Sequence, residues 1–179
     1  MRSLQIFKIW GIPFKIHPYW FAILFFFSWS ISNQINLTPN QIYDNKEAWL
    51  IGFSTSFLFL ASIILQEIVH TFVSLNQGVK IKNITFYFLG AILGIEKDCK
   101  NALGSIKIAL VRPLLCFSTA ILLLIITSFS ESKEQIIINI ITRLSILNLL
   151  LGFLNLIPIG TLDGGTLFNQ FSTTLNISS

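Results

Sequence analysis

Charged side chains are scarce in this chain. Only 11% of its 179 residues are Asp, Glu, Lys or Arg, whereas 53% are hydrophobic. Soluble globular domains carry about a quarter charged residues, so this composition excludes a soluble domain and indicates an integral membrane protein. The net charge of +4 is spread along the sequence and forms no dense basic patch of the kind that binds nucleic acid. The lipid bilayer is therefore the expected surrounding, and no nucleic-acid partner is expected.

Cysteine is almost absent as well. Cys99 and Cys116 are the only two in the sequence. They are too few for a disulfide framework or a cysteine metal cluster, and ordinary apolar packing is their expected role. A cleavable signal peptide is likewise not expected, because the aromatic run at 18–31 starts late and no small-residue cleavage pattern follows it.

The sequence has long apolar runs instead. A helix crosses the hydrocarbon core with about 20 apolar residues, and the chain has room for about four such spans. They are predicted at 18–32, 48–75, 106–129 and from 135 to a break at Pro158 and Gly160. Arg112 lies near the start of the third span, from which its long side chain is expected to reach back to the membrane surface. The predicted fold is an all-α integral membrane protein, a single membrane domain over 1–179 with no further soluble domain.

A small β element is predicted beside the helices. Residues 79–88 alternate with period two, which is typical of a strand, and a second strand is expected after Gly90 or Gly94. Residues 4–16 alternate more loosely and predict two short strands around a turn at 11–13. The expected architecture is therefore about four transmembrane helices with a small membrane-associated β element.

The distribution of basic residues predicts the orientation in the membrane. Two basic residues, Lys46 and Lys133, lie in the connections after the first and third spans. Eight lie before the first span or between the second and third: Arg2, Lys8, Lys15, Lys80, Lys82, Lys97, Lys100 and Lys107. Because basic residues accumulate on the cytoplasmic side, the amino end and the strand-containing connection are expected in the cytoplasm of this multi-pass protein.

Three ionisable side chains lie in apolar surroundings. Glu67 and His70 end the uncharged stretch 48–66, and Asp163 follows the break in the fourth span. Ionisable groups at membrane depth are costly and usually serve a function. Asp163 at a helix break could approach the second span and provide a metal ligand, or it could simply cap a turn.

The spacing around Glu67 suggests a metal site. On a helix Gln66 and His70 lie four residues apart on one face, with Glu67 beside them. Zinc proteases use His-Glu-x-x-His in this way, with two histidines on the ion and the glutamate as general base towards its water. Here the first histidine is replaced by Gln66. A buried Glu67–His70 ion pair that fixes helix packing is the alternative interpretation.

The order of these parts resembles the site-2 protease family of intramembrane zinc metalloproteases, in particular its compact bacterial type. The resemblance covers nearly the whole chain. Residues 11–20 are similar to the family's amino-terminal strand and first span, and 65–70 lie at its His-Glu-x-x-His position. Residues 155–165 closely match the family's Asn-Pro-Asp-Gly-type motif, whose aspartate is the third zinc ligand. Residues 78–94 resemble the membrane-associated sheet that binds substrate as an added strand.

The resemblance implies a role for each site residue. It implies Glu67 as the catalytic base and a zinc ion held by His70 and Asp163, with Gln66 in the position of the missing histidine. It implies a membrane protein as substrate or partner. The substrate-binding residues that it implies are Phe86, Tyr87, Phe88, Leu89 and Asn155.

Two departures from the family leave the activity open. A neutral amide is a far poorer zinc donor than imidazole, so Gln66→His is expected to restore a complete site. Val111-Arg112-Pro113 stands where the family usually has Ala-Gly-Pro. Three functions remain open: an intramembrane zinc metalloprotease with activity impaired at Gln66, an inactive pseudoprotease that binds membrane proteins, and a small ion or proton transport component.

Overall fold

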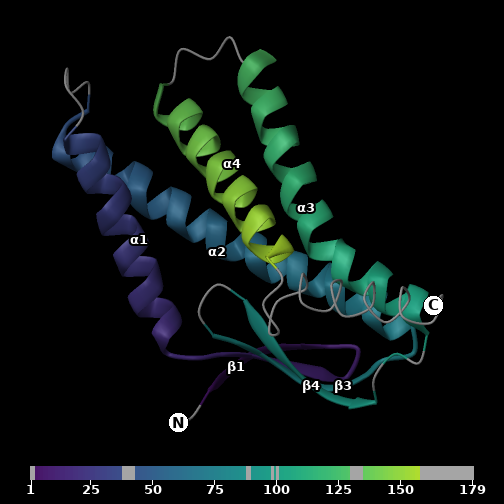
Figure 1. Cartoon of the computed structure of the whole chain (residues 1–179). Coiled ribbons are helices and arrows are strands. Elements are labelled where there is room, and N and C mark those ends of the chain that lie inside the picture. The colour runs from purple at the N-terminus through teal and green to yellow at the C-terminus, as the bar shows by residue number, and fades with distance from the viewer. Residues whose placement is uncertain are drawn as a thin grey trace.

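The computed structural model describes residues 3–37, 43–87, 90–97, 99, 101–129 and 135–157. Within them the chain is mostly helical, with a sheet at one end of the helices (Figure 1). The elements in chain order are β1 (Leu4–Ile9), β2 (Ile12–Ile16), α1 (Tyr19–Asn36), α2 (Asn45–Asn76), β3 (Lys80–Phe86), β4 (Ala91–Lys97), α3 (Ala102–Phe129) and α4 (Gln135–Leu156).

Among the residues that the structure describes, three helical segments are long and apolar enough to cross a membrane, namely Asn45–Asn76, Leu103–Phe129 and Gln135–Leu156. The chain is therefore a multi-pass membrane protein. The helix expected over 18–32 forms as α1, but it is not among these three, and Asn33, Gln34 and Asn36 make its last turn polar. That α1 also spans the membrane stays a prediction.

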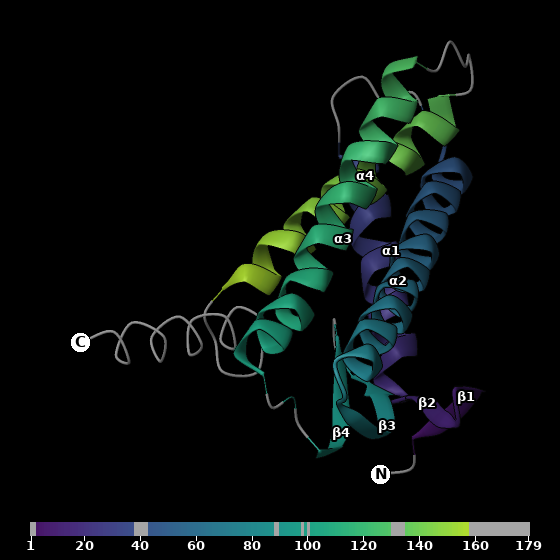
Figure 2. The same ribbon diagram turned by 90° about the vertical axis from the view of Figure 1, so that its right-hand side faces the viewer.

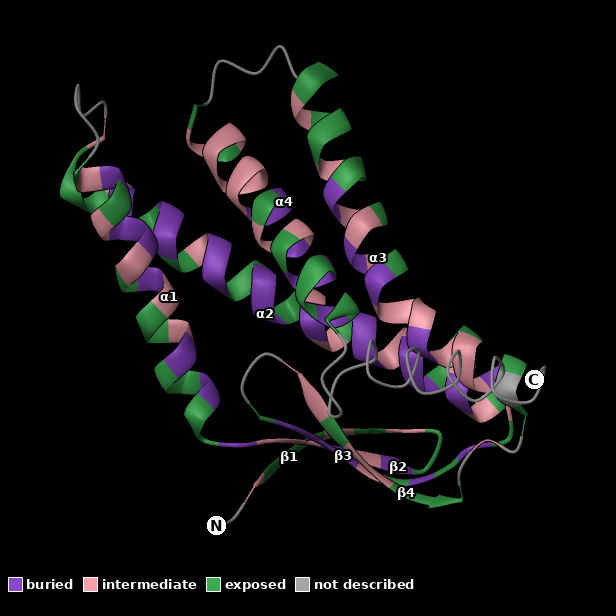
Figure 3. Cartoon of the chain, viewed as in Figure 1, coloured by how far each residue is buried: buried purple, intermediate pink, exposed green. Residues whose placement is uncertain are grey.

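The helices pack in two pairs, α1 on α2 and α3 on α4, and α2 also contacts α3 and α4. Close approach of α1 and α2 depends on Gly52, where an added Cβ would lie 2.5 Å from the backbone oxygen of Ser28. The carboxylate of Asp44 accepts a hydrogen bond from the Glu47 backbone and begins α2 as a capping box. Much of the outward surface of α3 is exposed and apolar, as a lipid-facing surface would be (Figure 3).

The β element contains the four strands that the sequence predicted, joined into a single sheet. Its four strands form one mixed sheet in the order β1-β2-β3-β4. The two hairpins, β1–β2 and β3–β4, are each antiparallel, and β2 pairs with β3 in parallel, with Phe14 opposite Ile84. The sheet lies below the carboxyl-terminal part of α2, as the second view also shows (Figure 2). Sequence periodicity predicted the hairpins but not the parallel pairing that joins them.

The turn of the first hairpin differs from the prediction. The sequence placed it at 11–13, whereas the structure turns at Trp10 and Gly11, with φ of 51° and 79°. Positive φ at both central residues is the signature of the tight two-residue turns that suit the twist of a hairpin. Ile12 and Pro13 instead begin β2. Pro13 precedes the parallel ladder, which starts at Phe14, so its missing N–H costs that ladder no hydrogen bond.

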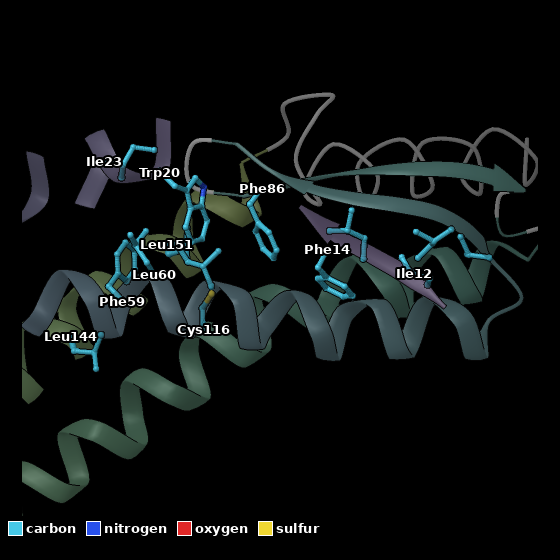
Figure 4. Packing of buried hydrophobic residues seen from close by; sticks show 14 residues of the cluster. Ile12, Phe14, Trp20, Ile23, Phe59, Leu60, Phe86, Cys116, Leu144 and Leu151 are labelled. Carbon is cyan, nitrogen blue, oxygen red and sulfur yellow. The ribbon is translucent and has the colours of Figure 1, made fainter. Parts of the chain in front are cut away.

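The main core lies between the sheet and the helices (Figure 4). Phe14 and Phe86 from the sheet are fully buried and pack beside Trp20 of α1. The indole N–H of Trp20 donates to the backbone oxygen of Tyr87. The core thereby fixes the sheet against the helices, next to the polar groups described below.

Candidate metal centre

The residues singled out by the sequence occupy the last third of α2. Gln66, Glu67 and His70 are all buried. Their helical spacing brings them onto the side of α2 that α3 and α4 cover. The structure therefore confirms that these polar side chains are internal, and the nature of their partners decides what they can do.

Gln66 is engaged at both ends of its amide. Its Nε2 donates to Oδ1 of Asn148 on α4 at 2.9 Å, and its Oε1 accepts from Sγ of Cys116 on α3 at 3.2 Å. Asn148 also accepts from Ser62 Oγ at 3.2 Å, and Asn155 Nδ2 lies 3.7 Å from the sulfur of Cys116. We call these five residues the amide network. It links α2 to both neighbouring helices.

Sequence reasoning missed Asn148, which is at the centre of the amide network. Its side chain is fully buried, and its Nδ2 donates to the backbone oxygen of Leu144 at 2.9 Å. An asparagine inside an uncharged apolar helix, seven residues and thus two turns before Asn155, was the available signal. Cys116, expected only to pack, also contributes its thiol as a hydrogen-bond partner.

Glu67 and His70 meet a third ionisable residue, Arg112 of α3. Nη2 of Arg112 donates to Oε2 of Glu67 at 2.6 Å and lies 3.3 Å from Nδ1 of His70. The other carboxylate oxygen of Glu67 is 3.5 Å from the same imidazole nitrogen. We call these three residues the charged cluster. The Glu67–His70 contact that the sequence suggested is present, but Arg112 makes the shortest contact in the cluster.

The expected position of Arg112 was wrong. The sequence predicted a side chain that reaches back to the membrane surface, whereas only 14% of it is exposed and it points to Glu67. The physical reason is that burying the carboxylate of Glu67 without a cation would cost much free energy. This cost exceeds the free energy that the guanidinium loses when it leaves water. Pro113, the next residue, is fully buried inside α3.

The donors described here do not fit a zinc ion. Zinc needs three or four N, S or O ligands at about 2.0–2.3 Å. Among the residues that the structure describes, no three His, Cys, Asp or Glu side chains are grouped to hold a metal. The oxygen of Gln66 already accepts from Cys116, and Glu67 is bound by a guanidinium. Nε2 of His70 and Oε1 of Glu67, both buried and without a hydrogen-bond partner in the described structure, have the character of open ligand positions.

Three of the predicted site residues, Asp163, Phe88 and Leu89, lie outside the described residues. The expected convergence of Glu67, His70 and Asp163 is thus met for the first two, and for the third it stays a prediction. Asn155 is buried and belongs to the amide network.

The predicted substrate-binding residues of the sheet lie at the end of β3. Phe86 is fully buried, while Tyr87 is partly exposed and stacks on His17 with ring centroids 5.4 Å apart. The backbone of Phe86 already pairs with β2 on one side and β4 on the other. Over Ile84–Phe86 neither edge of β3 is available for an added strand, because β2 and β4 occupy both.

Comparison with known proteins places these features in a family. The profile of peptidase family M50 matches residues 124–178. A zinc metalloprotease of Methanocaldococcus jannaschii is 33% identical over 166 residues, which are 91% of this chain and 43% of that protein. A Synechocystis protein named "putative zinc metalloprotease" is 29% identical over 174 residues, 94% of this chain and 44% of its own length. The chain thus spans less than half the length of these curated relatives.

A solved structure supports the same family, and the match covers a larger share of the relative's chain. The site-2 protease from Methanocaldococcus jannaschii superposes with a TM-score of 0.65 and 30% sequence identity. The match covers 97% of this chain and 73% of that one. Fold, order of elements and sequence agree, and the chain belongs to the site-2 protease family, peptidase family M50.

Proposed function

We propose that this chain is a site-2-type pseudoprotease that binds membrane-embedded segments of other proteins and hydrolyses them poorly or not at all. One observation carries the proposal. Glu67, at the position of the family's general base, has its carboxylate 2.6 Å from the guanidinium of Arg112. A base must be within hydrogen-bond reach of the proton that it takes up, and here one of the two carboxylate oxygens is already bound to a guanidinium.

The position of Gln66 supports the same proposal. A metal-ligating side chain needs a lone pair directed at the ion, but both ends of this amide are hydrogen-bonded within the protein. A zinc ion held there would compete with the hydrogen bonds to Cys116 and Asn148 that fix the orientation of this amide. The position at which the family has a metal-binding histidine therefore serves helix packing here.

We propose that β4, one of the two outer strands of the sheet, binds the unwound segment of the partner protein. β4 is outermost on one side of the described sheet, and the side chains of Ile92 and Ile95 on it are exposed. An unwound segment could pair with this edge through main-chain hydrogen bonds. This moves the predicted substrate contact from the end of β3 to β4, beside Tyr87.

A cross-linking experiment with a matched strand tests segment binding. A photo-reactive residue is placed at Ile95 on β4 or at Ile6 on β1, the other outer strand, where the side chain is similarly exposed. The full chain in lipid nanodiscs is illuminated with a synthetic membrane-spanning peptide. We expect several-fold more cross-linked, uncleaved peptide from position 95. Equal labelling at both positions would contradict the proposal.

Zinc-dependent hydrolysis is the second candidate function. The buried Nε2 of His70, which has no hydrogen-bond partner in the described residues, favours it because such a nitrogen can ligate a metal. The ligands would be His70 and Asp163, with Gln66 as a weak third, and zinc would polarise the peptide carbonyl and activate water. Cleavage of the same peptide that rises with added zinc and is lost in Glu67→Gln would establish this function instead.

We also propose that the sheet end faces the cytoplasm. The basic residues of the sheet and of the start of α3 gather there, which follows the general excess of Lys and Arg on that side. A cysteine introduced at Lys82, which is well exposed, should resist an impermeant thiol reagent in intact cells, whereas one at Leu37 should react. Both variants are made with Cys99→Ser, and the reverse labelling would contradict this orientation.

A further inference from the structure

Arg112 occupies an unusual place for an arginine in a membrane-spanning helix. It lies inside α3, ten residues after that helix begins, and its side chain is largely buried. Its Nη2 is within 3.3 Å of both an oxygen of Glu67 and a nitrogen of His70. These are the two side chains that would face a metal ion in a zinc protease of this family. A cation therefore already stands beside them, and it is part of the protein.

We propose that the Arg112 guanidinium is the resident cation of this site and stands in for the metal ion. In this role it neutralises the buried carboxylate of Glu67 and holds the Nδ1 side of His70, so that the packing of α2 against α3 does not depend on zinc. The inference rests on the proposed function and deepens it, since it explains how the fold of an inactive family member stays stable without a bound zinc ion.

Electrostatics make the two cations mutually exclusive. A dication bound to His70 would share a low-dielectric interior with the guanidinium, and like charges repel strongly there. In the described structure the carboxylate of Glu67 is paired with the single positive charge of Arg112, and a dication would add two further positive charges to this pair. The Arg112–Glu67 pair is thus neutral without an added ion, although Oε1 of Glu67 and Nε2 of His70 have no hydrogen-bond partner in the described structure.

The amide network provides the second contact that replaces a metal ion in this site. Gln66, at the position of the family's missing metal ligand, joins α2 to α4 through its hydrogen bond to Asn148. Cys116 brings in α3. The Arg112–Glu67 ion pair and the Gln66–Asn148 hydrogen bond thus together join the helices that a bound metal ion would otherwise stabilise.

The experiment measures thermal unfolding of the full chain in nanodiscs, with zinc or with a chelator. The variants are Arg112→Gln, Glu67→Gln and the double variant, and the matched control is Arg143→Gln, at the other arginine inside a spanning helix. Arg143 donates to the neutral Gln34 at 3.2 Å and makes no ion pair in the described structure. Leaving one partner of a buried ion pair alone is strongly destabilising.

We expect Arg112→Gln and Glu67→Gln each to lower the melting temperature by on the order of 10 °C, and Arg143→Gln by only about 1–2 °C. The double variant should regain much of the loss, because it leaves no unpaired charge. The parent should melt at the same temperature with zinc and with chelator. Arg112→Lys, which keeps the charge, should lie between the parent and Arg112→Gln.

Two results would overturn the inference. One is a parent whose melting temperature falls with chelator and rises with zinc, since a resident cation makes the metal unnecessary. The other is a double variant whose loss equals the sum of the two single losses, since independent sites add. If Arg112→Gln cannot be purified, Arg112→Lys and the double variant decide the same question. Neither result bears on segment binding, which cross-linking at β4 measures separately.

Discussion

Two arginines inside apolar helices, Arg112 on α3 and Arg143 on α4, mark opposite ends of the helical bundle. At the sheet end Arg112 meets a carboxylate at 2.6 Å. At the far end Arg143 donates to an amide oxygen of Gln34 at 3.2 Å, and its Nε is buried without a hydrogen-bond partner in the described structure. The far end also has a neutral hydrogen bond from Asn139 to the Tyr43 hydroxyl.

The difference shows what the two ends are built for. A membrane helix tolerates one arginine at either end, but only at the sheet end does the cation balance a buried charge of opposite sign. That end also collects the amide network and the site of the family's chemistry. Within the described residues, the far end joins its helices through neutral hydrogen bonds, and Arg143 forms no ion pair there.

The largest contrast should appear in zinc uptake. The double variant Gln66→His with Arg112→Gly restores an imidazole and removes the cation, so we expect zinc to rise from trace levels towards one ion per chain. Gln66→His alone should bind little, because Arg112 remains and the hydrogen bond to Asn148 is weakened. The matched control combines Gln66→His with Arg143→Gly. Metal analysis of the purified proteins decides, and zinc in the control equal to that in the double variant would contradict the idea.

Removal of the acceptor opposite each arginine should give the next largest effect. Glu67→Ala leaves Arg112 buried without its carboxylate and should cost about 3–5 kcal/mol of unfolding free energy. Gln34→Ala removes one neutral hydrogen bond at the far end and should cost about 1 kcal/mol or less. Denaturation in mixed micelles measures both. Equal losses at the two ends would show that the charged cluster has no special role.

The amide network should give an intermediate effect. Asn148→Ala leaves Nε2 of Gln66 buried without its acceptor and should cost about 1–2 kcal/mol. Asn139→Ala at the far end of the same helix removes a hydrogen bond at a partly exposed position and should cost less than about 0.5 kcal/mol. The same unfolding experiment compares them, and the reverse order would show that the network is peripheral to stability.

The smallest effect is expected at the surface of the sheet. Lys82 and Glu96 form an ion pair at 4.0 Å, but their side chains are 74% and 57% exposed, against 14% and 3% for Arg112 and Glu67. Solvent screening should limit the loss in Lys82→Ala to about 0.5 kcal/mol or less. A larger loss would mean that this pair is shielded from water in the membrane-bound protein.

The sequence predicted the parts of the fold that depend on local pattern. Apolar run length gave the three spans, and alternation gave both hairpins, because these patterns reflect which faces are buried. The parallel pairing of Phe14 with Ile84 was not predictable in this way. It depends on how α1 and α2 bring distant strands together, and no local pattern records that.

The candidate site was predicted by residue type but not by partner. Glu67, His70 and Gln66 were found because polar groups in an apolar helix are conspicuous. Their bonds to Arg112 and Asn148 come from other helices, whose rotation about their own axes cannot be inferred from one sequence. Arg112 was noted as a departure from the family. The predicted direction of its side chain was wrong, because the prediction considered α3 alone.

The parallel junction in the sheet has a consequence for the order of folding. Phe14 and Ile84 pair across 70 positions, and both α1 and α2 lie between them. Closing so long a loop is entropically costly and slow unless the intervening helices are already packed. The amino-terminal hairpin leaves the ribosome first and must wait for β3 until two helices have emerged. Pairing of β2 with β3 would therefore indicate that α1 and α2 have already packed together.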